Sequence, residues 1–268
     1  MDHKKPLTLS IIIPAYNEER QIKACLDAIA AQTEMPDEVL LVDNNSTDAT
    51  VQIANQYSFI TVIHEKKQGI VFARNAGFNA ATGDILGRID TDTIMPKNWV
   101  AKVKRFYAVP AHHDHALTGG GYFYNVSFPP RAVGGWIHSQ LALRFNRFIM
   151  GHYILWGSNM ALTRQQWDTV KELTCRDTDI HEDLDLAIHL HRLGHKITYR
   201  SKLRVGVKMR RMFDNYSSLH GNLLWWPRTL KRHNIKRWVF GWIGAYGLLA
   251  ISPLLIIANL PVKLLRGK

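Results

Sequence analysis

Short apolar runs alternate with stretches of helical periodicity over the first hundred residues of the chain. Four runs of aliphatic and β-branched residues predict buried parallel strands, at residues 7–13, 39–42, 60–63 and 85–89. Between these runs apolar residues recur every three or four positions, as Ile22, Leu26 and Ile29 do, which predicts amphipathic helices. Because the alternation continues over residues 7–107, we expect an α/β fold: a mostly parallel sheet with helices on both faces.

Polar residues and a glycine mark the expected helix ends. Asn17 is a candidate N-cap for the first helix, and Ser46 or Thr47 is a candidate for the second. The third predicted helix covers residues 70–81, and Gly83 is expected to end it at a C-cap position.

The pattern becomes looser after Tyr107. Three consecutive glycines at 119–121, with further glycine and proline pairs, are expected to break the chain into short pieces. Helices are predicted at residues 164–171 and 183–193, and a late strand at 197–199. We interpret this part as the same domain continued, with longer functional loops.

Net charge distinguishes the C-terminal part from the rest. The chain has 268 residues and a formal net charge of +12, which by itself would suggest nucleic-acid binding. Residues 1–199 are nearly neutral, however, with 20 Lys and Arg against 21 Asp and Glu, whereas residues 200–237 hold 11 basic residues and one acid. The positive charge is therefore a belt beside the most apolar segment, and no nucleic-acid partner is expected.

Residues 238–262, 25 in all, contain no charged side chain and would span a hydrocarbon core of about 30 Å if helical. Trp238, Trp242 and Tyr246 recur every four residues, as rings at a membrane interface do. Prolines and glycines within the segment leave three arrangements open: a spanning helix, a re-entrant or in-plane pair of short helices, and a buried core helix. The basic belt favours membrane attachment through this segment.

The cysteines do not suggest a disulfide framework. Only Cys25 and Cys175 are present, far apart and in no CxxC pattern, so a thiolate zinc site is not expected either. Cys25 lies on the apolar stripe of the first predicted helix, which indicates a core position.

Polar clusters directly follow three of the predicted strands, at residues 14–18, 43–48 and 90–92. In parallel sheets ligands bind beyond the carboxyl ends of the strands, so these clusters are expected to form one site. Neither GxGxxG nor GxxxxGK[ST] occurs in the chain, which argues against a nicotinamide dehydrogenase and a P-loop enzyme.

Asp90 and Asp92 flank Thr91 at the end of the fourth predicted strand, so their side chains leave on the same side. Two neighbouring carboxylates do not both ionise readily without a cation. Mg²⁺ or Mn²⁺ would remove the conflict and share its remaining coordination with substrate phosphates. The sequence therefore predicts a divalent metal at Asp90 and Asp92.

Other candidate residues have two interpretations each. Asp43 either binds a base or ribose or forms an Asx-turn, and Tyr16 either stacks on a ligand or covers the loop. Arg74 either neutralises a diphosphate or pairs with a carboxylate. Glu182 and Asp183 begin a predicted helix, where the helix dipole favours acids; the alternative is a general base that deprotonates an acceptor hydroxyl.

Six short motifs, in this order, resemble those of the inverting family-2 glycosyltransferases of the GT-A fold. They are IPAYNE at 13–18, VDNNSTD at 42–48, ARNAG at 73–77, DTD at 90–92, GSNMA at 157–161 and ED at 182–183. The resemblance extends over residues 8–200. It implies a GT-A fold and an enzyme that moves a sugar from a nucleotide-diphosphate sugar to an acceptor hydroxyl with inversion, assisted by Mg²⁺ or Mn²⁺.

The resemblance also implies roles for individual residues. The implied nucleotide- and donor-binding residues are Pro14, Ala15, Tyr16, Asn17, Glu18, Asp43, Arg74 and Asp90. Asp90 and Asp92 would hold the metal. Asp183 matches the general base, with Glu182 beside it, and Gly157, Ser158 and Asn159 match a loop between donor and acceptor. A UDP-sugar is the expected donor, and a glycan or lipid-linked molecule the expected acceptor.

Two departures from related sequences narrow the activity. His181 precedes the acid pair where processive polysaccharide synthases have Thr, and no Gln-x-x-Arg-Trp follows it, so transfer of a single sugar is expected. One alternative is a polyprenyl-phosphate glycosyltransferase, in which Lys208, Arg210 and Arg211 would hold the acceptor phosphate and no base is needed. A nucleotidyltransferase and a non-enzymatic membrane scaffold are further alternatives; the intact Asp90, Asp92 and Asp183 argue against the scaffold.

These interpretations divide the chain into three parts. Residues 1–199 are expected to form the GT-A catalytic domain, with the nucleotide-sugar part at 1–107 and the acceptor part at 108–199. Residues 200–237 would be a basic amphipathic linker or helix, and 238–268 an apolar tail that associates with the membrane. Because nucleotide sugars are cytoplasmic, the enzyme is expected on the cytoplasmic face of the membrane, attached through its C-terminal segment.

Overall fold

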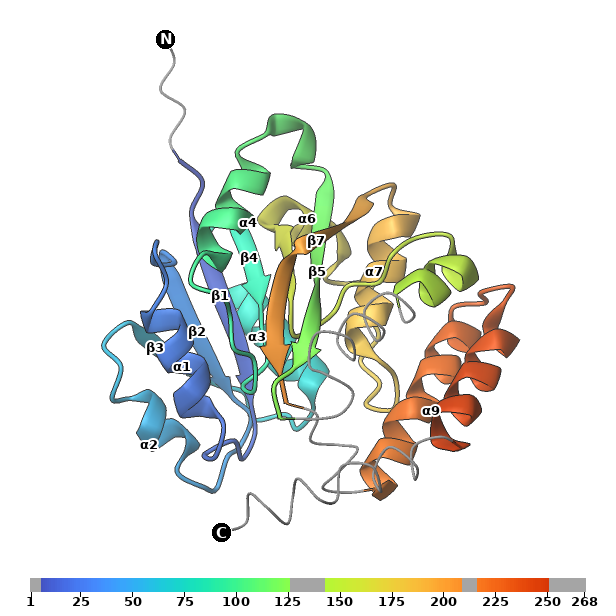
Figure 1. Cartoon of the computed structure of the whole chain (residues 1–268), viewed down its shortest axis with the longest axis horizontal. Helices are drawn as coiled ribbons and strands as arrows, with labels where there is room; N and C mark the ends of the chain where they lie inside the picture. The colour runs from blue at the N-terminus through green and yellow to red at the C-terminus, as the bar shows by residue number, and fades with distance from the viewer. Residues whose placement is uncertain (1–5, 126–142, 209–215, 251–268) are drawn as a thin grey trace.

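The computed structural model describes residues 6–125, 143–208 and 216–250, and its centre is a single seven-stranded sheet (Figure 1). The strand order is β3-β2-β1-β4-β6-β5-β7. Their bounds are β1 Leu9–Ala15, β2 Glu38–Asp43, β3 Ile60–His64, β4 Ile85–Arg88, β5 His115–Phe123, β6 Met160–Thr163 and β7 Lys196–Val207. Only β6 runs against its neighbours, so the prediction of a mostly parallel sheet is confirmed.

Helices cover both faces of the sheet, as the alternation of strands and helices predicted. They are α1 Ile22–Ala30, α2 Thr50–Ala54, α3 Ile70–Ala80, α4 Trp99–Tyr107, α6 Arg164–Val170, α7 Glu182–Arg192 and α9 Tyr216–Arg232, with a short 3-10 helix at Pro110–His112. Residues 143–150 and 238–250 are also helical.

Side-chain alternation along β1 separates two cores. Ile11 and Ile13 pack with residues of α1 and α4 on one face, while Ile12 packs with residues of α3, α6 and α7 on the other. All three isoleucines are fully buried. At about 1.5–3 kcal/mol for each such side chain, this two-sided burial explains why β1 is an uninterrupted apolar run.

The predicted ends of the early helices were wrong. Asn17 does not cap α1, whose N-cap is Gln21; it has a positive φ of 53° and belongs to the loop after β1. Neither Ser46 nor Thr47 caps α2, which begins at Thr50 after Ala49. These polar side chains are instead used in contacts between loops, which helical periodicity alone cannot reveal.

Gly83 also differs from its predicted role as a C-cap. Helix α3 ends at Ala80 with Ala81 at its C-cap. A Cβ at Gly83 would lie 2.6 Å from Oγ and 2.7 Å from N of Ser10, so the glycine permits close packing against β1.

The glycines at 119–121 lie within β5 and do not break the chain as expected. A Cβ at Gly119 would be 1.9 Å from the carbonyl oxygen of Leu203, and one at Gly121 would be 2.2 Å from the ring of Trp156. The register between β5 and β7 shifts between Gly119 and Gly120. Glycine is used here because the neighbouring strand and an indole ring approach the backbone too closely for any side chain.

The late strand predicted at 197–199 is present but much longer, because β7 continues to Val207. The first residues of the predicted basic linker at 200–237 thus belong to the sheet, and α9 follows within the same segment. Residues 238–250 form a helix that packs on α9: a Cβ at Gly241 would meet Leu230 at 2.8 Å. Within the residues described, no helix combines the length and the apolar character needed to cross a membrane.

Candidate active site

The loops after β1 and β2 lie against each other at the carboxyl edge of the sheet. The backbone N–H of Asn17 donates to Oγ of Ser46 at 3.0 Å, and the N–H of Thr47 donates to Oδ1 of Asn17 at 2.8 Å. The N–H of Glu18 donates to Oγ1 of Thr50 at 2.7 Å. The predicted convergence of residues 14–18 and 43–48 is therefore observed.

Asp43 is held in place at the end of β2 by two contacts. Its carboxylate is buried, accepts a hydrogen bond from the N–H of Ser46 at 3.1 Å and lies 3.2 Å from Nδ1 of His64. The contact to Ser46 reaches three residues along the chain, one more than an Asx-turn spans, so Asp43 stabilises its own loop without forming the Asx-turn offered by the sequence. Tyr16 is half exposed, so it is accessible to a ligand.

A chain of charges connects the end of β4 to the start of α7. Arg88 is buried; it forms an ion pair with Glu182 and a second one with Asp90, whose Oδ1 lies 3.0 Å from Nη2. Burial lowers the pKa of Arg88, but the attraction of Glu182 and Asp90 outweighs it and raises that pKa. Burial works against ionised Glu182 too, yet Arg88 and then Arg74 lower its pKa to about 2. Arg88 thus links the two acidic motifs as a fixed cation.

The loop at 157–159 supplies one contact from each of its residues. The N–H of Gly157 donates to Oδ2 of Asp183 at 2.9 Å, and Oγ of Ser158 donates to Oδ2 of Asp90 at 2.5 Å. The amide of Asn159 is fully buried and donates to the carbonyl oxygens of Gly120 and Leu203 at 3.0 and 2.8 Å. The loop that was predicted to lie between donor and acceptor therefore anchors both carboxylates.

Gly157 is required by the position of Arg88. A Cβ at residue 157 would lie 2.4 Å from Nη1 of Arg88, so any side chain would displace the guanidinium from Glu182. The glycine thus serves the ion-pair chain as well as the hydrogen bond to Asp183.

Asp183 has the environment of a general base. Its side chain is half buried at the first turn of α7, and Oδ1 accepts the N–H of Leu184 at 2.8 Å. Burial, and after it the negative charge of Glu182, raises the pKa of Asp183 above the usual aspartate value. A carboxylate with a raised pKa holds an abstracted proton more strongly, which general base catalysis needs.

Arg74 is placed differently from the expected diphosphate contact. It is fully buried, donates to the backbone oxygen of Glu182 at 2.5 Å and to Oδ1 of Asn75 at 2.9 Å. Burial lowers the pKa of Arg74 to about 10. The structure gives Arg74 a role in supporting the start of α7, and its contact with a diphosphate stays a prediction.

The charges of the site fit a divalent cation. Asp90 belongs to the ion-pair chain with Arg88 and Glu182, and Asp92 follows it two residues later. Asp92 is nearly buried. The pKa of the Cys25 thiol is raised, chiefly by burial and further by the negative charges of Asp92 and Asp90, so both carboxylates lie near this thiol. Carboxylate oxygens are the ligands that Mg²⁺ and Mn²⁺ prefer, so Asp90 and Asp92 suit such an ion by their chemistry.

Sequence reasoning missed Arg88 and Thr93. Thr93 accepts the N–H of Asp90 at 3.2 Å and donates to the backbone oxygen of Ser158 at 3.4 Å. A signal for Arg88 existed, because a charged residue near the end of a buried strand is almost never left unpaired. Its partner Glu182 lies 94 residues away, however, and no local pattern identifies it.

Replacing Arg88 should destabilise the protein, because its buried ion-pair partner Glu182 is charged. We expect Arg88→Met to lower the free energy of unfolding by about 3–5 kcal/mol, because Glu182 would remain buried without its ion-pair partner. Urea unfolding monitored by circular dichroism measures this. Because the pKa of Glu182 is lowered in the folded protein, the stability that its ion pair contributes depends on pH. The destabilisation by Arg88→Met should be full above the unfolded-state pKa of 4.5 and should shrink as the pH falls towards about 2.

The matched control is Lys23→Met, which breaks an exposed i,i+4 pair with Asp27 and should change stability little. Equal stability of Arg88→Met and the unmodified protein at pH 7 would contradict the ion-pair chain.

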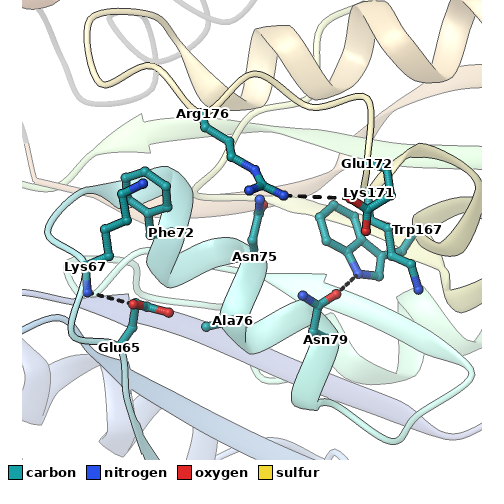
Figure 2. A pocket seen from close by; sticks show the side chains of 10 residues that line it. All are labelled: Glu65, Lys67, Phe72, Asn75, Ala76, Asn79, Trp167, Lys171, Glu172 and Arg176. Carbon is teal, nitrogen blue, oxygen red and sulfur yellow. Dashed lines mark hydrogen bonds and ion pairs between the residues drawn. The ribbon is translucent and has the colours of Figure 1, made fainter.

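A separate cavity of about 230 Å³ lies beside α3 and α6 (Figure 2). Asn75 and Asn79 line one side of it and Trp167 the other, with Oδ1 of Asn79 accepting from the indole N–H at 2.8 Å. Basic and acidic residues, among them Lys67 and Glu172, surround it. None of the predicted site residues lines this cavity, so we do not identify it as the candidate active site.

Comparison with known proteins identifies a family for this chain. The family described as Glycosyl transferase family 2 matches residues 10–162, more than half of the chain. The chain belongs to this family. Its matched segment includes five of the six motifs named above, and the acid pair at 182–183 follows beyond it.

Individual relatives match over shorter stretches. Glycosyltransferase AglE of Haloferax volcanii is 39% identical over 101 residues, which are 35% of this chain and 33% of that protein. The uncharacterized glycosyltransferase EpsJ of Bacillus subtilis is 39% identical over 119 residues, 43% of this chain and 34% of EpsJ. The chain thus spans about a third of the length of these relatives.

Solved structures confirm the GT-A fold. A mannosyltransferase from Pyrobaculum calidifontis in complex with GDP-Man and Mn²⁺ superposes with a TM-score of 0.67 at 17% identity, covering 96% of this chain and 74% of that one. Glucosyl-3-phosphoglycerate synthase of M. tuberculosis gives 0.59 at 21% identity, with 85% and 81% covered. At such identities the likeness establishes the fold only.

Proposed function

We propose that this protein transfers a single sugar from a nucleotide-diphosphate sugar to an acceptor hydroxyl with inversion at the anomeric carbon. The observation that supports this most is the arrangement at the end of β4. Asp183, the candidate base, and Asp90, the candidate metal ligand, are held by neighbouring residues of one loop, Gly157 and Ser158. Donor and acceptor chemistry would therefore meet at this loop.

In the proposed reaction Asp183 takes the proton of the acceptor hydroxyl. The acceptor oxygen forms a bond to the anomeric carbon from the face opposite the leaving group. The bond from that carbon to the phosphate oxygen breaks, and the nucleoside diphosphate leaves with the electron pair. The proton stays on Asp183, whose raised pKa favours this outcome.

Asp90 and Asp92 would hold Mg²⁺ or Mn²⁺, which supplies a positive charge to the departing diphosphate. The chain's own residues would orient the substrates. Ser158 and Arg88 hold Asp90 in place, and the Pro14–Glu18 loop and Asp43 would contact the nucleoside of the donor. The mannosyltransferase with a similar fold was solved with GDP-Man and Mn²⁺, and that pairing supports a metal-assisted nucleotide sugar here. UDP- and GDP-sugars are the first donors to test.

Thermal shift measurements with a panel of nucleotide sugars test donor binding. We expect one UDP- or GDP-sugar to raise the melting temperature with Mn²⁺ present and to lose most of that effect in chelator. Thymidine- and adenosine-diphosphate sugars and free sugars serve as comparisons. If no nucleotide sugar stabilises the protein with Mn²⁺ or Mg²⁺, the proposed donor class is wrong.

We further propose that the C-terminal helices attach the catalytic domain to the cytoplasmic face of a membrane. The helix at residues 238–250 buries Ala245 and Leu249, but leaves Val239, Phe240 and Ile243 exposed by 41–61%. Phe148, itself half exposed, contacts Phe240, with 5.7 Å between ring centroids. We call Phe148, Val239, Phe240, Ile243 and Tyr246 the apolar patch.

Basic residues border the apolar patch. Lys236 and Arg237 are exposed immediately before the same helix, and Arg237 lies over the ring of Phe148 at 4.6 Å from its centroid. Apolar side chains flanked by cations suit an anionic lipid surface, where the helix would lie in plane. The remaining part of the tail, residues 251–268, lies outside the described residues.

Replacing two residues of the apolar patch tests the attachment. Phe240→Ser with Ile243→Ser should weaken sedimentation with anionic phosphatidylserine vesicles by about tenfold or more, because both side chains would lose their apolar contact. Leu193→Ser, at an equally exposed site after α7, should have no effect. If the unmodified protein stays soluble with these vesicles at low salt, the attachment is wrong. Release by high salt alone would mean that the basic belt binds and the apolar patch does not insert.

A further inference from the structure

Four potential metal ligands from three chain segments gather on one side of α7. They are Cys175 in the loop before α7, Asp185 and His189 on α7, and His233 just after α9. One ligand atom from each lies within 4.8 Å of every other. Asp185 is two residues after Asp183, which places it on the opposite side of the helix, so this cluster is separate from the catalytic carboxylates.

Two ligands of the cluster are buried, and Cys175 and His189 are partly buried. Asp185 is fully buried, His233 has 4% of its side chain exposed and His189 has 15%. Oδ1 of Asp185 lies 2.8 Å from Nε2 of His233 and 3.4 Å from Nε2 of His189. Both imidazoles thus present Nε2 to a single carboxylate oxygen, with the i,i+4 spacing of Asp185 and His189 placing them on one helix face.

One buried nitrogen of the cluster makes no hydrogen bond within the described part of the chain. Nε2 of His189 is buried and has no hydrogen bond among the described residues, although it faces Asp185. A buried polar atom without a partner costs about 1–3 kcal/mol, and such atoms frequently mark an ion that completes the site. A metal ion placed among the four ligands would satisfy this nitrogen.

We propose that Cys175, Asp185, His189 and His233 bind a structural zinc ion that fastens α9 to α7. One thiolate, two imidazoles and one carboxylate are all zinc ligands, and four protein ligands in a closed setting are typical of a structural site. Ligand atoms within 4.8 Å of one another need only small shifts to reach the tetrahedral separation. The mixed set with a thiolate suits Zn²⁺ better than Mg²⁺ or Mn²⁺.

Without metal the cluster is held by a hydrogen bond. Nδ1 of His233 lies 3.3 Å from Nη1 of Arg192, which can only donate, so the ring proton is on Nε2 and is donated to Asp185. When zinc binds Nε2, this proton moves to Nδ1 and Nη1 of Arg192 turns away. Arg192 keeps its second contact, to the backbone oxygen of His233. The thiol of Cys175 loses its proton to solvent on binding.

The proposed ion would connect the catalytic helix to the C-terminal helices. Figure 1 shows α9 beside α7, the helix that carries Asp183 at its first turn. Exposed ion pairs, such as that of Arg232 with Asp177 at 2.6 Å, also link these segments but are screened by salt. A buried zinc ion would keep the helices joined at any ionic strength.

Metal analysis of the full-length protein tests the proposal. After dialysis with zinc and then against zinc-free buffer containing Mg²⁺, we expect one zinc per chain. Cys175→Ser and His189→Gln should each reduce zinc affinity by at least about tenfold, or about 1.4 kcal/mol, in competition with a chromogenic chelator. Substituted cobalt should give a sulfur-to-cobalt charge-transfer band that Cys175→Ser lacks.

The controls replace the same residue types elsewhere. Cys25→Ser, in α1, and His195→Gln, whose Nδ1 lies 2.6 Å from Asp114, should keep one zinc per chain. The absence of tightly held zinc from the unmodified protein would overturn the proposal. So would zinc that is kept by Cys175→Ser and His189→Gln but lost in Asp92→Asn, because that ion would belong to the donor site.

Discussion

Asp183→Asn is expected to transfer sugar about 10²–10⁴-fold more slowly than the unmodified enzyme. The amide preserves the size of the side chain and can still contact the N–H of Gly157 through its oxygen, but it cannot accept the acceptor proton. Donor affinity should change little, because the carboxylate acts on the acceptor. A lower kcat with an unchanged donor dissociation constant is the expected pattern.

The control for this variant is Asp168→Asn, which removes an exposed carboxylate paired with Lys171 and should leave the rate unchanged. An unimpaired rate of Asp183→Asn on the natural acceptor would contradict the assignment of the base. It would favour a polyprenyl-phosphate glycosyltransferase, whose acceptor is already an anion. Of the residues suggested to hold that phosphate, Arg210 and Arg211 lie outside the described residues.

Asp92→Ala should lower transfer by at least about 10³-fold and weaken binding of the nucleotide sugar in Mn²⁺. Charge stabilisation by the metal contributes several kcal/mol to phosphate departure, and each 1.4 kcal/mol is a factor of ten in rate. Titration calorimetry of the donor with Mn²⁺ and with chelator measures the binding effect. The circular dichroism spectrum should be unchanged.

Asp168→Ala is again the control, since it removes an exposed carboxylate that is paired with Lys171. Full activity of Asp92→Ala in chelator would show that transfer does not depend on a metal at this position.

The regular half of the fold could be predicted because its signals are local. The run of β1 and the apolar stripe of α1 read directly as strand and helix, and both are observed. Strand β5 could not be predicted, because Gly119 and Gly121 are needed for close approach to Leu203 and Trp156. Those neighbours are defined only by the fold.

The candidate site was predictable where a motif carries the chemistry and hidden where a distant residue does. The positions of Asp90 and Asp183 near one loop follow the motifs, while the ion pair of Arg88 with Glu182 does not. The four proposed zinc ligands could not be predicted from the sequence for the same reason. Asp185 and His233 are 48 residues apart, and Cys175 lies in no cysteine pattern. Spacing rules for metal sites do not extend to ligands joined by tertiary packing.

The proposed activity is tested most directly by following the fate of the donor with ³¹P and ¹H NMR. The enzyme is incubated with Mn²⁺ and the nucleotide sugar that stabilises it, and water serves as the acceptor where no other is known. We predict release of a nucleoside diphosphate and, as the first free sugar, the anomer opposite to that of the donor. Asp92→Ala should release neither. A sugar released first with the donor's own anomeric configuration would contradict inversion. In a separate incubation with a nucleoside triphosphate and a sugar 1-phosphate, release of pyrophosphate would indicate a nucleotidyltransferase instead.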